Sequence, residues 1–261
     1  MGYTVDSEGR VIDTDDSSSS GGGRRSSSVS TSGGLSLVRI YLYMFAGLLI
    51  TAGISVGLGL LFTNIFNGAD LEAMNNAAVA YLVILVVSAI SVLVLSVLLN
   101  VFLYKGKSLW VPSILYVVSM GVLLSAFTIV IEWSVLGLAF GITAGTFGLM
   151  ALIAFLSKGN LSGLAVAGLG LLFGAMILSV VNIILYFATG GAWTMLYIVI
   201  SFILLAAMML ITIFDMWRIK KICEKGEMTP NLELYCAFTL YVDFVYILIR
   251  IIYIILLSKR R

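Results

Sequence analysis

Long runs of apolar residues alternate with short polar breaks from Leu37 to the end of the chain. An α-helix needs about 20 consecutive apolar residues to cross the hydrocarbon core of a bilayer, and each run reaches that length. A helix also satisfies its own backbone hydrogen bonds, which lipid cannot do. The pattern therefore predicts seven transmembrane helices, at residues 38–62, 77–104, 109–131, 134–156, 162–187, 192–217 and 232–257.

The breaks between these runs are short, and none is long enough to hold a soluble domain. Short connections favour antiparallel packing of consecutive helices in a bundle. We therefore expect an all-α integral membrane protein in which sequential helices are neighbours. Because no catalytic domain lies outside the membrane, we do not expect an enzyme, and no motif indicates a cofactor.

Composition supports this class and excludes several others. Hydrophobic residues make up 61% of the chain and charged residues 11%, whereas a soluble domain has roughly 45–50% and about 25%. The chain has no histidine, which excludes histidine-based general bases and histidine-ligated metals. A net charge of +2 gives no argument for nucleic-acid binding. A response to pH or to a cation must therefore use carboxylates.

The first 36 residues differ from the rest of the chain. They contain runs of serine and glycine, five acidic residues and few apolar ones. Such a segment cannot bury enough apolar surface to offset its chain entropy. We therefore divide the chain into a disordered Ser/Gly-rich cytoplasmic tail, residues 1–36, and a seven-helix transmembrane domain, residues 37–261.

Lysine and arginine residues predict the orientation, because they concentrate in cytoplasmic loops. They lie in the tail and in every second loop, whereas the remaining loops carry only acids such as Asp70, Glu72 and Glu132. The N-terminus is thus expected in the cytoplasm. The basic residues 259–261 are an exception, since seven crossings place them outside. A re-entrant last helix would keep them inside; we favour the crossing.

Three pairs of glycines have the GxxxG spacing that lets helix backbones approach closely in membranes. We expect these pairs to support tight packing within the bundle rather than dimerisation. The pairs are Gly53 and Gly57, Gly141 and Gly145, and Gly170 and Gly174.

Ionisable residues at membrane depth are the most informative feature. Each costs ~2.5–3.5 kcal/mol at a helix centre and usually serves a function. Eleven of the thirteen acids lie in the tail, the loops or the edges of the spans, which leaves Asp215 and Asp243. Arg250 is the one cation at comparable depth. It lies ~10 Å beyond Asp243 on its helix, so we expect it to meet a neighbouring helix or to extend outward.

Asp215 and Asp243 lie on two consecutive helices that are joined by one cytoplasmic loop, residues 218–231. Antiparallel helices that leave this loop can place the two carboxylates at similar depth. Two carboxylates in contact at low dielectric cannot both be charged cheaply, so they would share a proton. This predicts a pH sensor without histidine. Carboxylate oxygens also suit calcium, which makes the pair the candidate metal ligands. The alternative is that each aspartate is simply paired with a polar neighbour such as Asn182, Thr143 or a tyrosine.

Four short motifs follow one another in the second half of the chain: Ile142-Thr-Ala-Gly-Thr-Phe-Gly148, Asn160-Leu-Ser-Gly163, Phe214-Asp-x-x-x-Ile-Lys220 and Leu240-Tyr-Val-Asp-Phe244. Together they resemble the Bax inhibitor-1 family, also called the transmembrane Bax-inhibitor-motif family, in its bacterial form. The resemblance spans roughly residues 37–257. It implies two three-helix layers around a central C-terminal helix, and a pH-sensitive calcium leak with a paired-aspartate sensor, which falls on Asp215 and Asp243.

The chain departs from some relatives in two places. Those relatives have an arginine at the end of the second span that latches the aspartate pair; here the nearest cations are Lys105 and Lys107. Both also serve as cytoplasmic topology charges, and Arg250 is the third candidate latch. Some relatives carry a glutamate near the position of Gly141, so the ion path can differ.

Three functions follow from the sequence. The first is a cation leak, most simply for calcium, in a bacterial plasma membrane; its partners would be lipid, calcium ions and protons. The second is a non-conducting regulator that binds a membrane protease or another membrane protein. The third is a proton-coupled transporter, against which the lack of inverted repeats argues.

Overall fold

The computed structural model describes residues 3–5, 11–13, 25–68, 70–189, 194–226 and 228–259. Within these residues it has seven long helices, and each is long and apolar enough to cross a membrane. The prediction of seven spans is therefore confirmed. The helices are α1 (Arg25–Gly68), α2 (Leu71–Tyr104), α3 (Trp110–Val130), α4 (Trp133–Leu156), α5 (Ser162–Thr189), α6 (Thr194–Lys225) and α7 (Pro230–Lys259).

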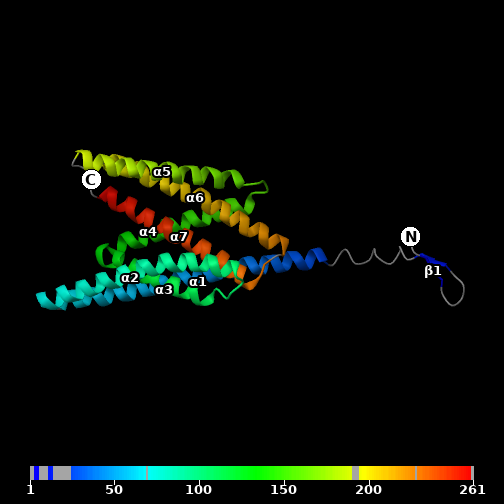
Figure 1. Cartoon of the computed structure of the whole chain (residues 1–261), viewed down its shortest axis with the longest axis horizontal. Coiled ribbons are helices and arrows are strands. Elements are labelled where there is room, and N and C mark those ends of the chain that lie inside the picture. The colour runs from blue at the N-terminus through cyan, green and yellow to red at the C-terminus, as the bar shows by residue number, and fades with distance from the viewer. Residues whose placement is uncertain are drawn as a thin grey trace.

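The helices form two groups with α7 between them (Figure 1). α1, α2 and α3 pack together on one side, and on the other side α6 contacts both α4 and α5. α7 contacts α1, α4 and α6, and a larger share of it is buried than of any other span. It ends at the end of the bundle opposite the start of α1 (Figure 1), as expected for a last helix that crosses.

Two short connections do not give the packing expected from their length. Ile131 and Glu132 alone join α3 to α4, and residues 157–161 join α4 to α5. In the described part of the chain, however, neither pair packs along its length. A short connection holds only the linked ends together, while the body of a helix packs where its side chains fit. For α4 that place is against α6 and α7. The prediction that consecutive helices are neighbours is wrong for these two pairs.

The N-terminal region contains two short strands and the start of the first helix among its described residues. Tyr3–Val5 (β1) pairs antiparallel with Val11–Asp13 (β2). Helix α1 begins at Arg25, and the part of it that could span a membrane begins at Gly34, close to the predicted boundary at residue 36. Once a helix is nucleated, each further residue adds a backbone hydrogen bond at little cost, which explains the extension through a serine-rich segment. The other residues of the predicted tail lie outside the described residues.

The glycines that permit close packing are not those of the GxxxG pairs. A Cβ atom added at any of the six GxxxG positions would meet no heavy atom within 4 Å. A Cβ at Gly121 of α3, in contrast, would lie 2.9 Å from Cβ of Ile54 on α1. A Cβ at Gly59 would overlap the Thr128 side chain. The prediction from GxxxG spacing is thus wrong, because spacing places two glycines on one face but does not say which face meets a partner.

Candidate functional site

The turn between α6 and α7 places the two intramembrane aspartates on neighbouring helices. Gly226 has a φ of +72°, a conformation that glycine adopts without strain at the end of a helix. Thr229 accepts a hydrogen bond at its Oγ1 from the backbone N–H of Leu232, at 3.3 Å. Pro230 is the first residue of α7, where its missing N–H is tolerated. The two helices then run antiparallel and pack against each other.

Asp243 of α7 lies inside the bundle, with only 6% of its surface exposed. Its neighbours Phe244 and Val245 are buried too. Among the described residues, its Oδ2 atom has no hydrogen-bond partner. Thr212 of α6 is buried and lies near this carboxyl group. Its hydroxyl donates its proton to the carbonyl oxygen of Met208, at 2.8 Å, and so has none left to donate to the carboxylate.

Asp215 of α6 is partly exposed. Its carboxylate lies near enough to Asp243 for the two groups to repel each other when both are charged. Arg218 is the cation that acts on Asp215, and a spacing of three residues places both on one helix face. The structure thus brings together the two aspartates that the sequence selected. Their role as a sensor stays a prediction.

Sequence reasoning missed Thr212 and Arg218. Both lie three residues from Asp215, on either side of it. Residues at this spacing are neighbours on a helix surface, so the sequence did contain the signal. Arg218 was missed because it was assigned to the loop, whereas α6 continues to Lys225. Thr212 lies within the predicted span 192–217, but the sequence does not say which face of that helix meets a partner.

The three candidate latch cations lie elsewhere. Lys105 and Lys107 are exposed, and the Lys107 Nζ atom lies 5.6 Å from the centre of the Phe102 ring. Arg250 is partly buried, two turns beyond Asp243 on α7. In the part of the chain that the structure describes, none of the three forms an ion pair with either aspartate.

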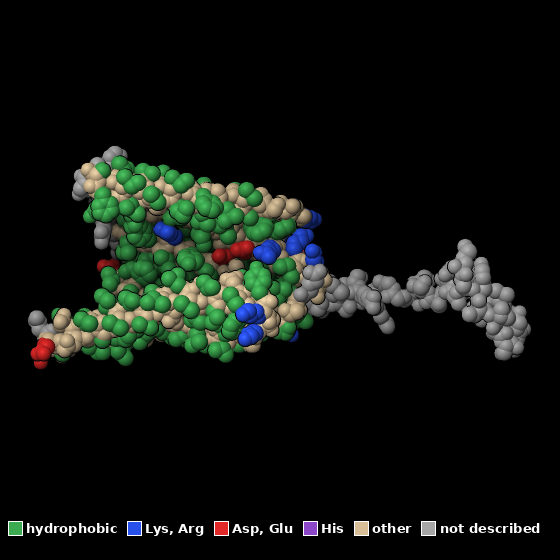
Figure 2. All heavy atoms as spheres, in the orientation of Figure 1, with side chains coloured by type: hydrophobic (Ala, Val, Ile, Leu, Met, Phe, Trp, Pro, Cys, Tyr) green, Lys and Arg blue, Asp and Glu red, His purple; other side chains and the backbone are tan. Residues whose placement is uncertain are grey.

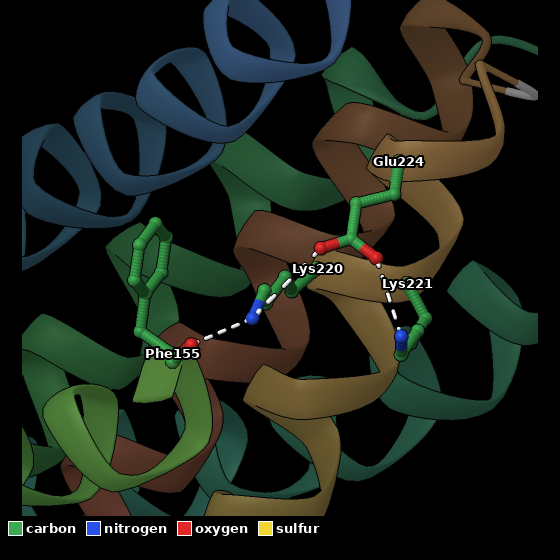
Figure 3. Close-up of polar contacts among 4 residues, drawn as sticks. All are labelled: Phe155, Lys220, Lys221 and Glu224. Carbon is green, nitrogen blue, oxygen red and sulfur yellow. Dashed lines mark hydrogen bonds and ion pairs between the residues drawn. The ribbon is translucent and has the colours of Figure 1, made fainter. Parts of the chain in front are cut away.

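A basic side chain joins α6 to the end of α4 beside this site (Figure 3). The Lys220 Nζ atom donates to the backbone carbonyl oxygen of Phe155, at 2.6 Å, and lies 4.9 Å from the centre of its ring. Glu224 competes for the same amine at 3.8 Å and pairs with Lys221 at 3.3 Å. A cation on the last carbonyls of a helix compensates its unpaired acceptors and its dipole.

Charged side chains are few on the helical part of the molecule and are unevenly placed (Figure 2). Apolar side chains cover the helices, many of the lysines and arginines in view lie toward one end of the bundle, and acidic side chains are visible at the other end (Figure 2). A few acidic and basic side chains are also visible in the furrow between the two helix groups (Figure 2). No group of three or more Cys, Asp or Glu residues that could hold a metal ion occurs among the described residues. Calcium at the aspartate pair would therefore need water or carbonyl oxygens as its other ligands.

The fold and this site define a polytopic membrane protein with seven candidate spans in its described part and neighbouring aspartates on α6 and α7. The chain belongs to the Bax inhibitor-1 family: the family model Bax1-I, inhibitor of apoptosis-promoting Bax1, matches residues 35–261. The match begins within α1 and covers α2 to α7 completely, and it confirms the family resemblance found in the four motifs. A search of curated proteins found no match.

Proposed function

We propose that this protein is a pH-sensitive cation leak channel, with calcium as the permeant ion, and not an enzyme. One observation carries the proposal: Asp243 is buried in the bundle with an unpartnered carboxylate oxygen, beside a second carboxylate on the adjacent helix. Such an arrangement is costly in a membrane, and intramembrane acids of this kind generally serve ion or proton pathways.

The pair can respond to pH because protonation changes its net charge. With one shared proton, the two carboxylates can form a hydrogen bond and leave a single negative charge between α6 and α7. Without it, two like charges repel each other at low dielectric. The repulsion is relieved when the helices move apart or when a cation enters between them. Either response couples protonation to cation passage.

Orientation and location complete the proposal. The basic loops and the acidic loops alternate along the chain, which favours an N-terminus in the cytoplasm. We place the protein in a bacterial plasma membrane, where a leak would move calcium down its gradient into the cell. Lipid, calcium ions and protons are then its partners.

A flux assay tests the proposal. Purified protein is reconstituted into vesicles that hold a calcium-sensitive dye. Calcium entry is then measured between about pH 5 and about pH 8, a range that includes the pKa values of strongly perturbed carboxyl groups. We expect entry to change several-fold with pH, and the change to disappear in Asp215→Asn and in Asp243→Asn. Asp70→Asn, which removes an exposed acid outside the bundle, is the matched control and should behave as the wild type.

Two results would contradict the channel. Flux that is no greater than in empty vesicles at any pH would favour a non-conducting regulator of another membrane protein. Flux with an unchanged pH profile in both aspartate variants would show a channel that is controlled elsewhere.

A further inference from the structure

A cavity of about 270 Å³ lies between the two helix groups. Aromatic side chains line much of it: Trp133 and Phe140 from α4, Phe127 from α3, and Phe244 from α7. Leu48 and Val56 of α1 and Leu248 and Ile252 of α7 supply further apolar surface. The cavity extends from Trp133, the first residue of α4, to Phe244, the neighbour of Asp243.

The cavity exists because α4 diverges from the first group of helices. In the described part of the chain α4 packs against α6 and α7 but not along α1 or α3. The opposite wall is closed, since α1 and α3 interlock where Gly121 meets Ile54. On the α4 wall, Gly137 lines the cavity and has open space where a Cβ atom would be. The side of the cavity between α3 and α4 is therefore the one that helix packing does not close.

The polar groups of the lining are poorly suited to hold water or an ion. The Thr51 hydroxyl bonds the Tyr241 hydroxyl at 2.6 Å and lies 3.3 Å from the carbonyl oxygen of Val117. The Thr128 hydroxyl lies 2.7 Å and 3.0 Å from two backbone carbonyl oxygens. That leaves one further hydroxyl in the lining, on Ser55. A buried water needs two to four polar partners, and cavities lined by apolar atoms stay dry.

We propose that this cavity binds the acyl chain of a membrane lipid. At this depth the surrounding solvent is hydrocarbon, and an empty cavity would forfeit the van der Waals contacts of its lining. A chain that enters between α3 and α4 restores them without dehydrating a polar group. Its headgroup would lie near Trp133, a residue type that favours the membrane interface. The inference does not depend on the proposed channel, although the chain would contact the residue next to Asp243.

Photolabelling with a lipid analogue tests the proposal. The protein is placed in phospholipid vesicles that contain a fatty acid with a photoreactive diazirine in mid-chain. After illumination, the labelled residues are located by mass spectrometry. Trp133 is 51% exposed and should be labelled from the bilayer in any case. Phe244 and Val245 are only 3% and 1% exposed, so label on them reports a chain inside the cavity. We expect such label.

Gly137→Phe fills the cavity, and Gly141→Phe is its matched control. Gly141 lies one turn further along α4, is also open at its Cβ position and does not line the cavity. We expect labelling of Phe244 and Val245 to fall at least several-fold in Gly137→Phe and to persist in Gly141→Phe. If Gly137→Phe does not fold, Gly137→Leu makes the same comparison with a smaller side chain.

Two outcomes would overturn the proposal. The first is an absence of label on Phe244 and Val245 in the wild type, or label that Gly137→Phe does not reduce. The second is a cavity filled with water. Ser55→Cys, in a background with Cys223 and Cys236 changed to alanine, would then react rapidly with a charged, water-soluble thiol reagent.

Discussion

Tyr241 and Asp243 lie two residues apart on α7, and both are buried. The Tyr241 hydroxyl is 2.6 Å from that of Thr51 on α1, and its ring packs against Tyr116. The Oδ2 atom of Asp243 has no such partner among the described residues. The Ser113 Oγ and Trp217 Nε1 atoms share this property among the described residues, but Asp243 alone of the three can carry a charge. A buried acceptor without a partner costs free energy, and ionisable groups at membrane depth generally serve a function.

The Tyr241 pair gives a prediction about stability. Tyr241→Phe removes the bond to Thr51, keeps the ring, and should lower the free energy of unfolding by about 0.5–1.5 kcal/mol. Denaturant unfolding in detergent measures the change. Tyr246→Phe, on an exposed tyrosine, is the control and should have little effect. An equal loss in both variants would show that the buried bond contributes nothing specific.

At the scale of helices, side chains far apart in the sequence determine which helices meet. Lys220 caps a carbonyl 65 residues away, at the end of α4. Gly121 lets α3 approach α1. The apolar runs predicted every span, because a helix in lipid needs only length and hydrophobicity. They could not predict these contacts, which depend on the direction in which each helix face points. For the same reason, two predictions were wrong: that the GxxxG glycines permit close helix packing, and that α3 packs along α4.

Lys220 offers a test at this scale. Lys220→Met keeps an apolar side chain of similar length but loses the bond to the Phe155 carbonyl oxygen. Because charge-assisted hydrogen bonds contribute more than neutral ones, we expect unfolding to become easier by about 1–2 kcal/mol. Lys221→Met is the matched control, since Lys221 is more exposed and its ion pair among the described residues is with Glu224. Thermal unfolding in detergent compares them. A Lys220→Met protein as stable as Lys221→Met would show that the cap does not hold α4 against α6.

The aspartate pair shows how far sequence reasoning reaches at a site. Selecting Asp215 and Asp243 needed only their depth in the spans and a shared loop, both visible in the sequence. Arg218 was missed because the end of α6 was placed too early, and Thr212 was missed because the sequence does not say which face of α6 meets α7. The cavity lined by Phe244, the neighbour of Asp243, forms where α3 and α4 diverge. No pattern in the sequence predicts it.

For the whole molecule, an odd number of crossings places the two ends of the chain on opposite sides of the membrane. We expect a fluorescent protein fused to the N-terminus to be active in the cytoplasm, and alkaline phosphatase fused after residue 261 to be active outside. The basic residues at the C-terminus are then an exception to the usual charge rule. Activity of the fluorescent protein, and not of the phosphatase, at both ends would show that α7 does not cross.

We propose that the carboxylates of Asp215 and Asp243 act as one proton-sharing unit that controls cation flux. The most direct test compares the pH dependence of calcium flux in Asp215→Asn, Asp243→Asn and the double variant. Groups that act as a unit give non-additive effects. We therefore predict that each single variant loses as much of the pH response as the double variant does. A partial loss in each single variant, with the two losses adding up in the double variant, would show that the aspartates titrate independently and would contradict the account.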